Sequence, residues 1–144
     1  MKLSINDIIL GVDDLERAVT FYRAMGMKGP GIQGAELPGD ETIPAGAVGV
    51  FEIAPGVILS LFPRAELAKA ARVPREKLAG TGGTLGFAVG SREELTEILD
   101  TAQKAGGTQV GEPHLHPWGL FSGYFEDTEA NLWEIFVPPA PHPS

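Results

Sequence analysis

Glu134 is the residue whose surroundings in this sequence most clearly call for chemistry. It lies in residues 131–137, predicted to be the second strand of a hairpin that begins with an aromatic strand and continues through an acidic turn. Strand alternation places it beside Phe136 on one apolar face, while Trp133 and Ile135 occupy the other. Because burying an unpaired charge is costly, Glu134 must line a polar cavity or have a specific partner.

Both functional and structural roles fit a carboxylate at this position. Glu134 could act as a metal ligand or general base, or it could anchor a cationic group of a ligand. It could instead be paired with Arg or Lys, or share a proton with Asp7. Asp7 could face it across a pocket, which would raise one of the two pKa values, or it could be a strand start in water.

The loop over residues 112–119 holds His114, His116 and Trp118. His116 could enter a cavity as a general base or replacement metal ligand, and Trp118 could stack on a flat ligand. Both histidines could equally be surface residues, since each is next to a proline. The third histidine, His142, lies in the proline-rich tail, residues 138–144. The remaining aromatic residues in predicted strands are most simply core residues: Phe51, Phe62, Phe121, Tyr124 and Trp133.

Strands and helices must position these candidate residues, and the first half of the chain contains one group of them. We expect a strand over 3–12, then a helix capped by Asp13 with Glu16 reaching back, ended by Gly26 or Gly29. A short strand over 32–37, a hairpin of 46–53 with 57–62, and a partly helical connector over 64–83 follow.

The second half repeats this order. A strand over 84–89 leads to a helix capped by Ser91 and closed by Gly106, then a short strand over 108–111, the histidine loop and the hairpin. Offsets of 77 and 74 residues align the first and last strands of the two halves. A duplicated βαβββ unit predicts an α+β fold in which two modules form a curved mixed sheet around a central cavity, with helices outside. The predicted boundaries are a single domain over 1–137, made of module one (1–63), a connector (64–82) and module two (83–137), followed by the tail.

Composition narrows the functional class. The 144 residues are 43% hydrophobic with a net charge of −8, which disfavours nucleic-acid binding, and no stretch is long enough for a membrane span. The chain has no cysteine, so a metal would need His, Asp, Glu or water. A cytoplasmic protein is the expectation.

The sequence resembles the vicinal oxygen chelate superfamily, which includes glyoxalases, bleomycin-resistance proteins and extradiol dioxygenases. The likeness lies in residues 8–22 (IILGVDDLERAVTFY), residues 91–107, and residues 123–134 (GYFEDTEANLWE). The turn in the last segment departs from the family, with Thr128 and Ala130 where Pro and Gly are often found. The resemblance implies the doubled fold and a homodimer, but no single reaction.

The resemblance also implies where a metal would be held. The family's ligand positions correspond here to Asp7, Ser60, Thr84 and Glu134. Hydroxyl groups are weak ligands for a divalent cation, so this set is incomplete, although two carboxylates with waters or His116 could still hold a hard cation loosely.

Two functional hypotheses follow. The first is a small-molecule-binding protein with a metal-free or weakly metal-binding cavity. The second is a lyase, isomerase or dioxygenase that uses a divalent metal or Glu134 as general base. The predicted cavity residues are Asp7, Ser60, Phe62, Thr84, His116, Trp118, Glu134 and Phe136.

Overall fold

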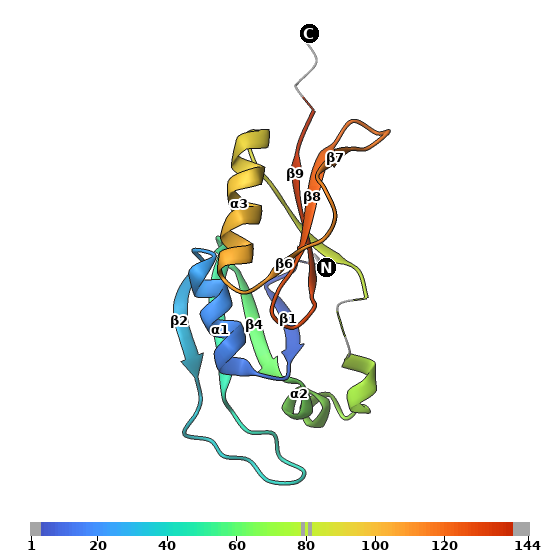
Figure 1. Ribbon diagram of the computed structural model, residues 1–144. Coiled ribbons are helices and arrows are strands. Elements are labelled where there is room, and N and C mark those ends of the chain that lie inside the picture. Colours follow the sequence, from blue (N-terminus) through green and yellow to red (C-terminus); the bar gives the residue numbers. More distant parts are fainter. Residues whose placement is uncertain (1–3, 79, 81, 140–144) are drawn as a thin grey trace. The chain divides into compact units, whose positions relative to one another are not determined.

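Two units make up the chain in the computed structural model, and they share a βαβββ order to which the first unit adds two helices after its last strand and the second unit adds one short strand (Figure 1). They comprise residues 1–81 and 82–144, and the structure describes residues 4–78, 80 and 82–139. Each unit has its own mixed sheet, with a helix packed against it. The α+β class and the repeated βαβββ order are therefore confirmed. His142 and most of the predicted tail lie outside the described residues.

The first unit forms a four-stranded sheet in the order β1-β4-β3-β2. Its helix α1 contacts β2, β3 and β4 and buries Tyr22 near Phe51, with ring centroids 6.2 Å apart. Leu59 and Leu61 of β4 are buried in this core, so Ser60 and Phe62 lie on the opposite face. The elements are β1 (Asp7–Val12), α1 (Leu15–Ala24), β2 (Lys28–Gln33), β3 (Val48–Ala54), β4 (Val57–Pro63), α2 (Arg64–Ala71) and the 3₁₀ helix η1 (Arg75–Leu78).

The second unit forms a sheet in the order β5-β9-β8-β6, with β7 also paired to β8. Helix α3 contacts β6, β8 and β9, and the buried residues Leu95, Leu99, Phe125, Trp133 and Ile135 make the core of this unit. The elements are β5 (Thr84–Ala88), α3 (Arg92–Lys104), β6 (Thr108–Gln109), β7 (His114–Leu115), β8 (Phe121–Glu126) and β9 (Leu132–Val137).

Strand register shows the repeat directly. In the first unit β1 is parallel to β4, with Asp7 beside Ile58; in the second β5 is parallel to β9, with Thr84 beside Leu132. These partners are separated by the same offsets of 77 and 74 residues that align the two halves of the sequence. Ser60 and Glu134 are therefore equivalent positions of the two units.

Several predicted boundaries were wrong. The first strand begins at Asp7, and the start of the predicted segment, Leu3, lies outside the described residues. The strand expected over 32–37 is β2, which lies earlier because it pairs with β3. Residues 112–119 were expected to be a loop but contain β7, because His114 and Leu115 pair with β8.

The cap of α1 also differs from the prediction. Asp14 caps the helix by accepting a hydrogen bond from the Arg17 amide at 3.1 Å. Asp13 instead pairs with Arg64 at 2.6 Å and with Arg75 at 2.5 Å. Two adjacent acids can each cap a helix, and these ion pairs to α2 and η1 decide which one does.

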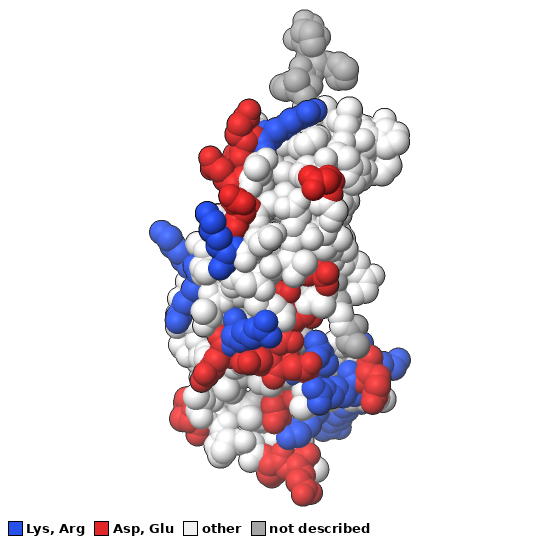
Figure 2. Space-filling view, in the orientation of Figure 1, with Lys and Arg blue, Asp and Glu red and all other residues white. Residues whose placement is uncertain are grey.

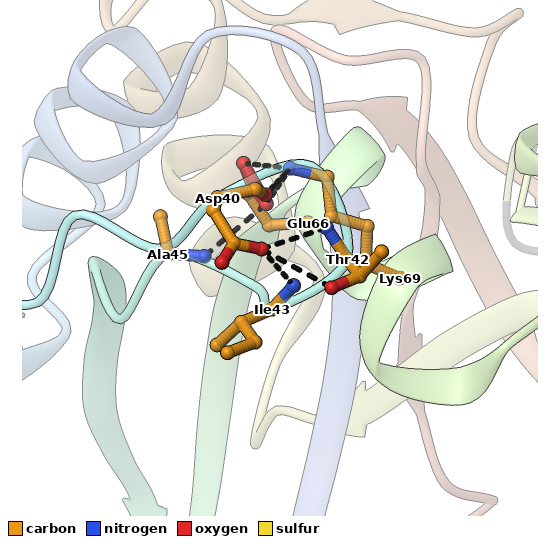
Figure 3. A network of polar contacts seen from close by, with 6 residues as sticks. All are labelled: Asp40, Thr42, Ile43, Ala45, Glu66 and Lys69. Atoms are coloured by element: carbon orange, nitrogen blue, oxygen red, sulfur yellow. Dashed lines mark hydrogen bonds and ion pairs between the residues drawn. The ribbon is translucent and has the colours of Figure 1, made fainter.

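The long loop between β2 and β3 is tied to α2 (Figure 3). Asp40 Oδ1 accepts hydrogen bonds from the amides of Thr42 at 2.8 Å and Ile43 at 2.7 Å. Glu66 accepts one from the Ala45 amide, and Lys69 donates to the Asp40 carbonyl at 2.9 Å. The loop is thus held by the first unit itself.

Charges of both signs are mixed around α2 and η1 on the face shown in Figure 2. This segment contains five of the chain's eleven basic residues: Arg64, Lys69, Arg72, Arg75 and Lys77.

No helix within the described ranges is long and apolar enough to cross a membrane. Homodimerisation and a cytoplasmic location stay predictions.

The turn between β8 and β9 fixes the register of the strand that carries Glu134. The buried Asp127 accepts hydrogen bonds from the amides of Glu129 and Asn131, at 2.8 and 2.9 Å, and from the Asn131 side chain at 2.9 Å. Ala130 has a φ of 62°, a left-handed conformation that favours glycine, which the family often has there.

We predict that Asp127→Ala lowers the free energy of unfolding by roughly 2–4 kcal/mol, because three donors lose their acceptor. Ala130→Gly in the same turn should instead stabilise the protein by up to about 1 kcal/mol through relief of strain. Urea unfolding of both variants checks this. A loss below about 1 kcal/mol for Asp127→Ala would show that the turn does not depend on these bonds.

Candidate functional site

Strand β9 presents Glu134 on the face of its sheet opposite α3. Trp133 and Ile135 are buried on the α3 side, whereas Glu134 and Phe136 on the other face are half-buried. The side chain of Glu134 is 22% exposed. The expected alternation is confirmed, but this second face is less buried than its apolar sequence indicated.

Tyr124 of β8 is the direct cross-strand neighbour of Glu134. Its hydroxyl group donates a hydrogen bond to Oε2 of Glu134 at 2.8 Å. Burial raises the pKa of Tyr124, and the hydrogen bond to the Glu134 carboxylate and its negative charge raise that pKa further. Tyr124 therefore stays a hydrogen-bond donor well into alkaline solution.

His116 approaches the same carboxylate oxygen from the β7–β8 connection. Its Nε2 atom lies 3.9 Å from Glu134 Oε2, and its side chain is only 11% exposed. The turn that places it is closed by hydrogen bonds from the His116 amide to the Leu120 carbonyl and from the Gly119 amide to the His116 carbonyl. Nε2 is buried without a hydrogen-bond partner among the described residues. Such an atom is costly to leave unpaired, and it sets His116 apart from the satisfied polar groups around it.

Trp118 extends this cluster to the surface. Its ring is stacked on His116, with centroids 4.5 Å apart and an interplanar angle of 11°, and the residue is 68% exposed. His114 contacts the His116 ring from another side, at 4.5 Å between centroids and an angle of 61°. The carboxylate of Glu134, the imidazole of His116 and the indole of Trp118 therefore form a continuous series that ends at solvent.

Strand β5 borders Glu134 on the side opposite β8. Gly86 is the parallel neighbour of Glu134, and a Cβ atom there would lie 3.8 Å from Glu134 Oε1 and 3.4 Å from Phe136 Cε1. Thr84, two residues earlier, is exposed. Phe136 and Thr84 thus lie on the sheet that carries Glu134.

In the first unit, the equivalent position has a different chemistry. The buried Ser60 donates a hydrogen bond to Asp7 Oδ1 at 2.7 Å. Asp7 is thus an exposed first residue of β1 and also has a specific partner. Phe62 shares the face of Ser60. The predicted approach of Asp7 to Glu134 across a cavity stays a prediction.

The residues at the family's metal positions fit a divalent cation poorly within either unit. The second unit offers Thr84 and Glu134, and Oε2 of Glu134 already accepts the Tyr124 hydroxyl. The first unit offers Asp7 and Ser60, and the Ser60 hydroxyl already donates a hydrogen bond to the Asp7 carboxylate. In the part of the chain that the structure describes, no three His, Asp or Glu side chains gather into a metal-sized cluster.

Tyr124 is the site residue that sequence reasoning missed, because it was counted with the core aromatics. The signal was present in the hairpin itself. Once Glu126 pairs with Leu132, antiparallel register places Tyr124 directly opposite Glu134.

We predict that the pKa of Tyr124 in the folded protein lies above the ordinary value of tyrosine and that Glu134→Gln lowers it, because the neighbouring negative charge is lost. Tyrosinate absorbance as a function of pH measures it. The chain has only two tyrosines, so Tyr124→Phe assigns the signal. An unchanged pKa in Glu134→Gln would contradict the contact.

Comparison with known proteins agrees with this architecture. The family model of the Glyoxalase/Bleomycin resistance protein/Dioxygenase superfamily matches residues 4–135. No curated protein matches the sequence. A glyoxalase-related enzyme from Fulvimarina pelagi has a similar structure, with a TM-score of 0.76, 21% identity, and coverage of 99% of this chain and 94% of that one.

A lactoylglutathione lyase from Agrobacterium tumefaciens is also similar, with a TM-score of 0.63, 24% identity, and coverage of 95% of each chain. These identities establish a shared fold and leave the reaction open. With the family match spanning nearly the whole sequence and the duplicated βαβββ unit in place, the chain belongs to the Glyoxalase/Bleomycin resistance protein/Dioxygenase superfamily.

Proposed function

We propose that this protein binds a small, flat, cationic molecule at Glu134, Tyr124, His116 and Trp118, without a resident metal. The binding role rests on the second unit alone, where these four residues lie within one connected cluster.

One observation carries the proposal: an exposed indole stacked on a histidine whose Nε2 is buried, unpartnered and 3.9 Å from a carboxylate. The face of an aromatic ring attracts cations and flat rings, and a half-buried carboxylate attracts a cation more strongly than one in water. A ligand that reaches from Trp118 to Glu134 would satisfy both groups.

A second candidate function is metal-free proton transfer. Glu134 Oε2 has the Tyr124 hydroxyl at 2.8 Å and His116 Nε2 at 3.9 Å. The Glu134 carboxylate, as a general base, therefore lies beside two side chains that can donate or accept a proton. Glu134 would take a proton from the carbon next to a ligand carbonyl, which leaves an enolate and a protonated Glu134. Glu134 would then return this proton to the same carbon, or release it to solvent while a solvent proton is added there, so that the net result is proton exchange or inversion at that carbon.

We predict that 2-naphthylmethylammonium binds this cluster and that Glu134→Gln weakens it at least about tenfold, because a charge-assisted hydrogen bond is lost. An NMR titration that follows the Trp118 indole N–H measures it. The indole of Trp133 is buried on the opposite face of β9 and serves as internal reference. Glu112→Gln, at an exposed loop position, removes the same charge and should bind like the wild type.

Equal binding by wild type and Glu134→Gln would overturn the proposal. Loss of the native fold in Glu134→Gln, seen as collapsed amide dispersion, would show instead that Glu134 is a structural partner.

The proton-transfer candidate makes a different prediction. Wild-type protein in deuterated buffer should accelerate deuterium uptake at the carbon next to the carbonyl of hydroxyacetone, and Glu134→Gln should not. One-dimensional NMR follows the loss of the proton signal. Uptake equal to the rate in buffer alone would leave binding as the function.

A further inference from the structure

The two oxygen atoms of the Glu134 carboxylate have different surroundings. Oε2 accepts the Tyr124 hydroxyl at 2.8 Å and has His116 Nε2 3.9 Å away. None of the described residues donates a hydrogen bond to Oε1. The carboxylate therefore has one oxygen engaged by the protein and one oxygen left for a ligand.

Gly86 keeps space beside that second oxygen. A Cβ atom at this position would lie 3.8 Å from Oε1, in van der Waals contact with the carboxylate. The backbone of Gly86 does not need glycine, because the left-handed conformation is found at other glycines and not here. A glycine inside a strand weakens the strand, and it often marks a place where another group approaches closely.

We infer that Tyr124 and Gly86 together make the site selective for ligands with a single cationic donor, such as an ammonium group on a flat ring, over amidinium or guanidinium ligands. This inference rests on the proposed binding function. The lack of a side chain at Gly86 gives the donor access to Oε1. Tyr124 is a positioning residue, because its hydrogen bond occupies Oε2.

The selectivity follows from hydrogen-bond geometry. Amidinium and guanidinium groups bind carboxylates best through two parallel N–H bonds, one to each oxygen. Here the second bond would have to displace the Tyr124 hydroxyl, which would then be left half-buried without its acceptor. An ammonium group needs only Oε1 and leaves the hydrogen bond of Tyr124 intact.

The test compares two probes that share a ring and a charge. 2-Naphthylmethylammonium has one donor nitrogen, and naphthalene-2-carboxamidinium has two donor nitrogens in one plane, which can bond both oxygens of a carboxylate at once. Each is titrated into wild type, Tyr124→Phe and Gly86→Val, with Trp118 indole shifts as the readout. Gly83→Ala is the matched control, because a Cβ atom there meets nothing within 4 Å.

Wild type should bind the ammonium probe about tenfold more tightly than the amidinium probe, the effect of one charge-assisted hydrogen bond. In Tyr124→Phe this ratio should fall to about one or reverse, because Oε2 becomes available for the second N–H bond. Gly86→Val should weaken both probes at least about fivefold by covering Oε1, while Gly83→Ala changes neither.

Three results would overturn the inference while leaving the proposed function in place. They are equal or inverted preference in wild type, an unchanged ratio in Tyr124→Phe, and unchanged affinity in a folded Gly86→Val. Failure of both probes to bind wild type would overturn the proposed function, and the selectivity would fall with it. Amide dispersion of each variant confirms that the compared proteins are folded.

Discussion

The hydrogen bond from the Tyr124 hydroxyl to Glu134 is the interaction on which the candidate site depends. A carboxylate on a half-buried strand requires a donor, and here the neighbouring strand supplies it at 2.8 Å. With that bond in place, Oε2 faces Tyr124 of β8 and Oε1 lies beside Gly86 of β5. The site thus follows from strand pairing, since β8 and β9 bring the two side chains together without any long loop.

Duplication explains why most of the fold could be predicted from the sequence. Residues 7 and 84 begin equivalent strands, and residues 58 and 132 pair beside them in the same way. Apolar stripes predicted both α1 and α3, and the start of α3 was predicted correctly because a local hydrogen bond, from the Glu94 amide to the Ser91 hydroxyl, caps it. The duplication also shows how the units diverged: Ser60 and Glu134 are equivalent, yet Ser60 donates to a carboxylate where Glu134 accepts.

Non-local contacts account for what could not be predicted. Strand β7 has two residues and exists because β8 pairs with it, so the local sequence around His114 indicated only a loop. Asp13 and Asp14 are equally good caps by sequence, but in the structure Asp13 forms ion pairs with Arg64 and Arg75, and Asp14 is the cap. The inward direction of His116 likewise depends on a turn that closes through Leu120 and on the stacked ring of Trp118. The sequence singles out Glu134 as a candidate site residue, which stays a prediction, whereas its hydrogen-bond partner Tyr124 is predicted to be a core aromatic residue.

We propose that protein hydrogen bonds, and not a metal ion, hold the Glu134 carboxylate. The first experiment to make is elemental mass spectrometry of protein purified without chelator or histidine tag. We expect a metal content far below about one equivalent per chain, and the same metal content in Glu134→Ala. About one equivalent of a divalent metal that is lost in Glu134→Ala would contradict it, and would assign Glu134 the role of a ligand.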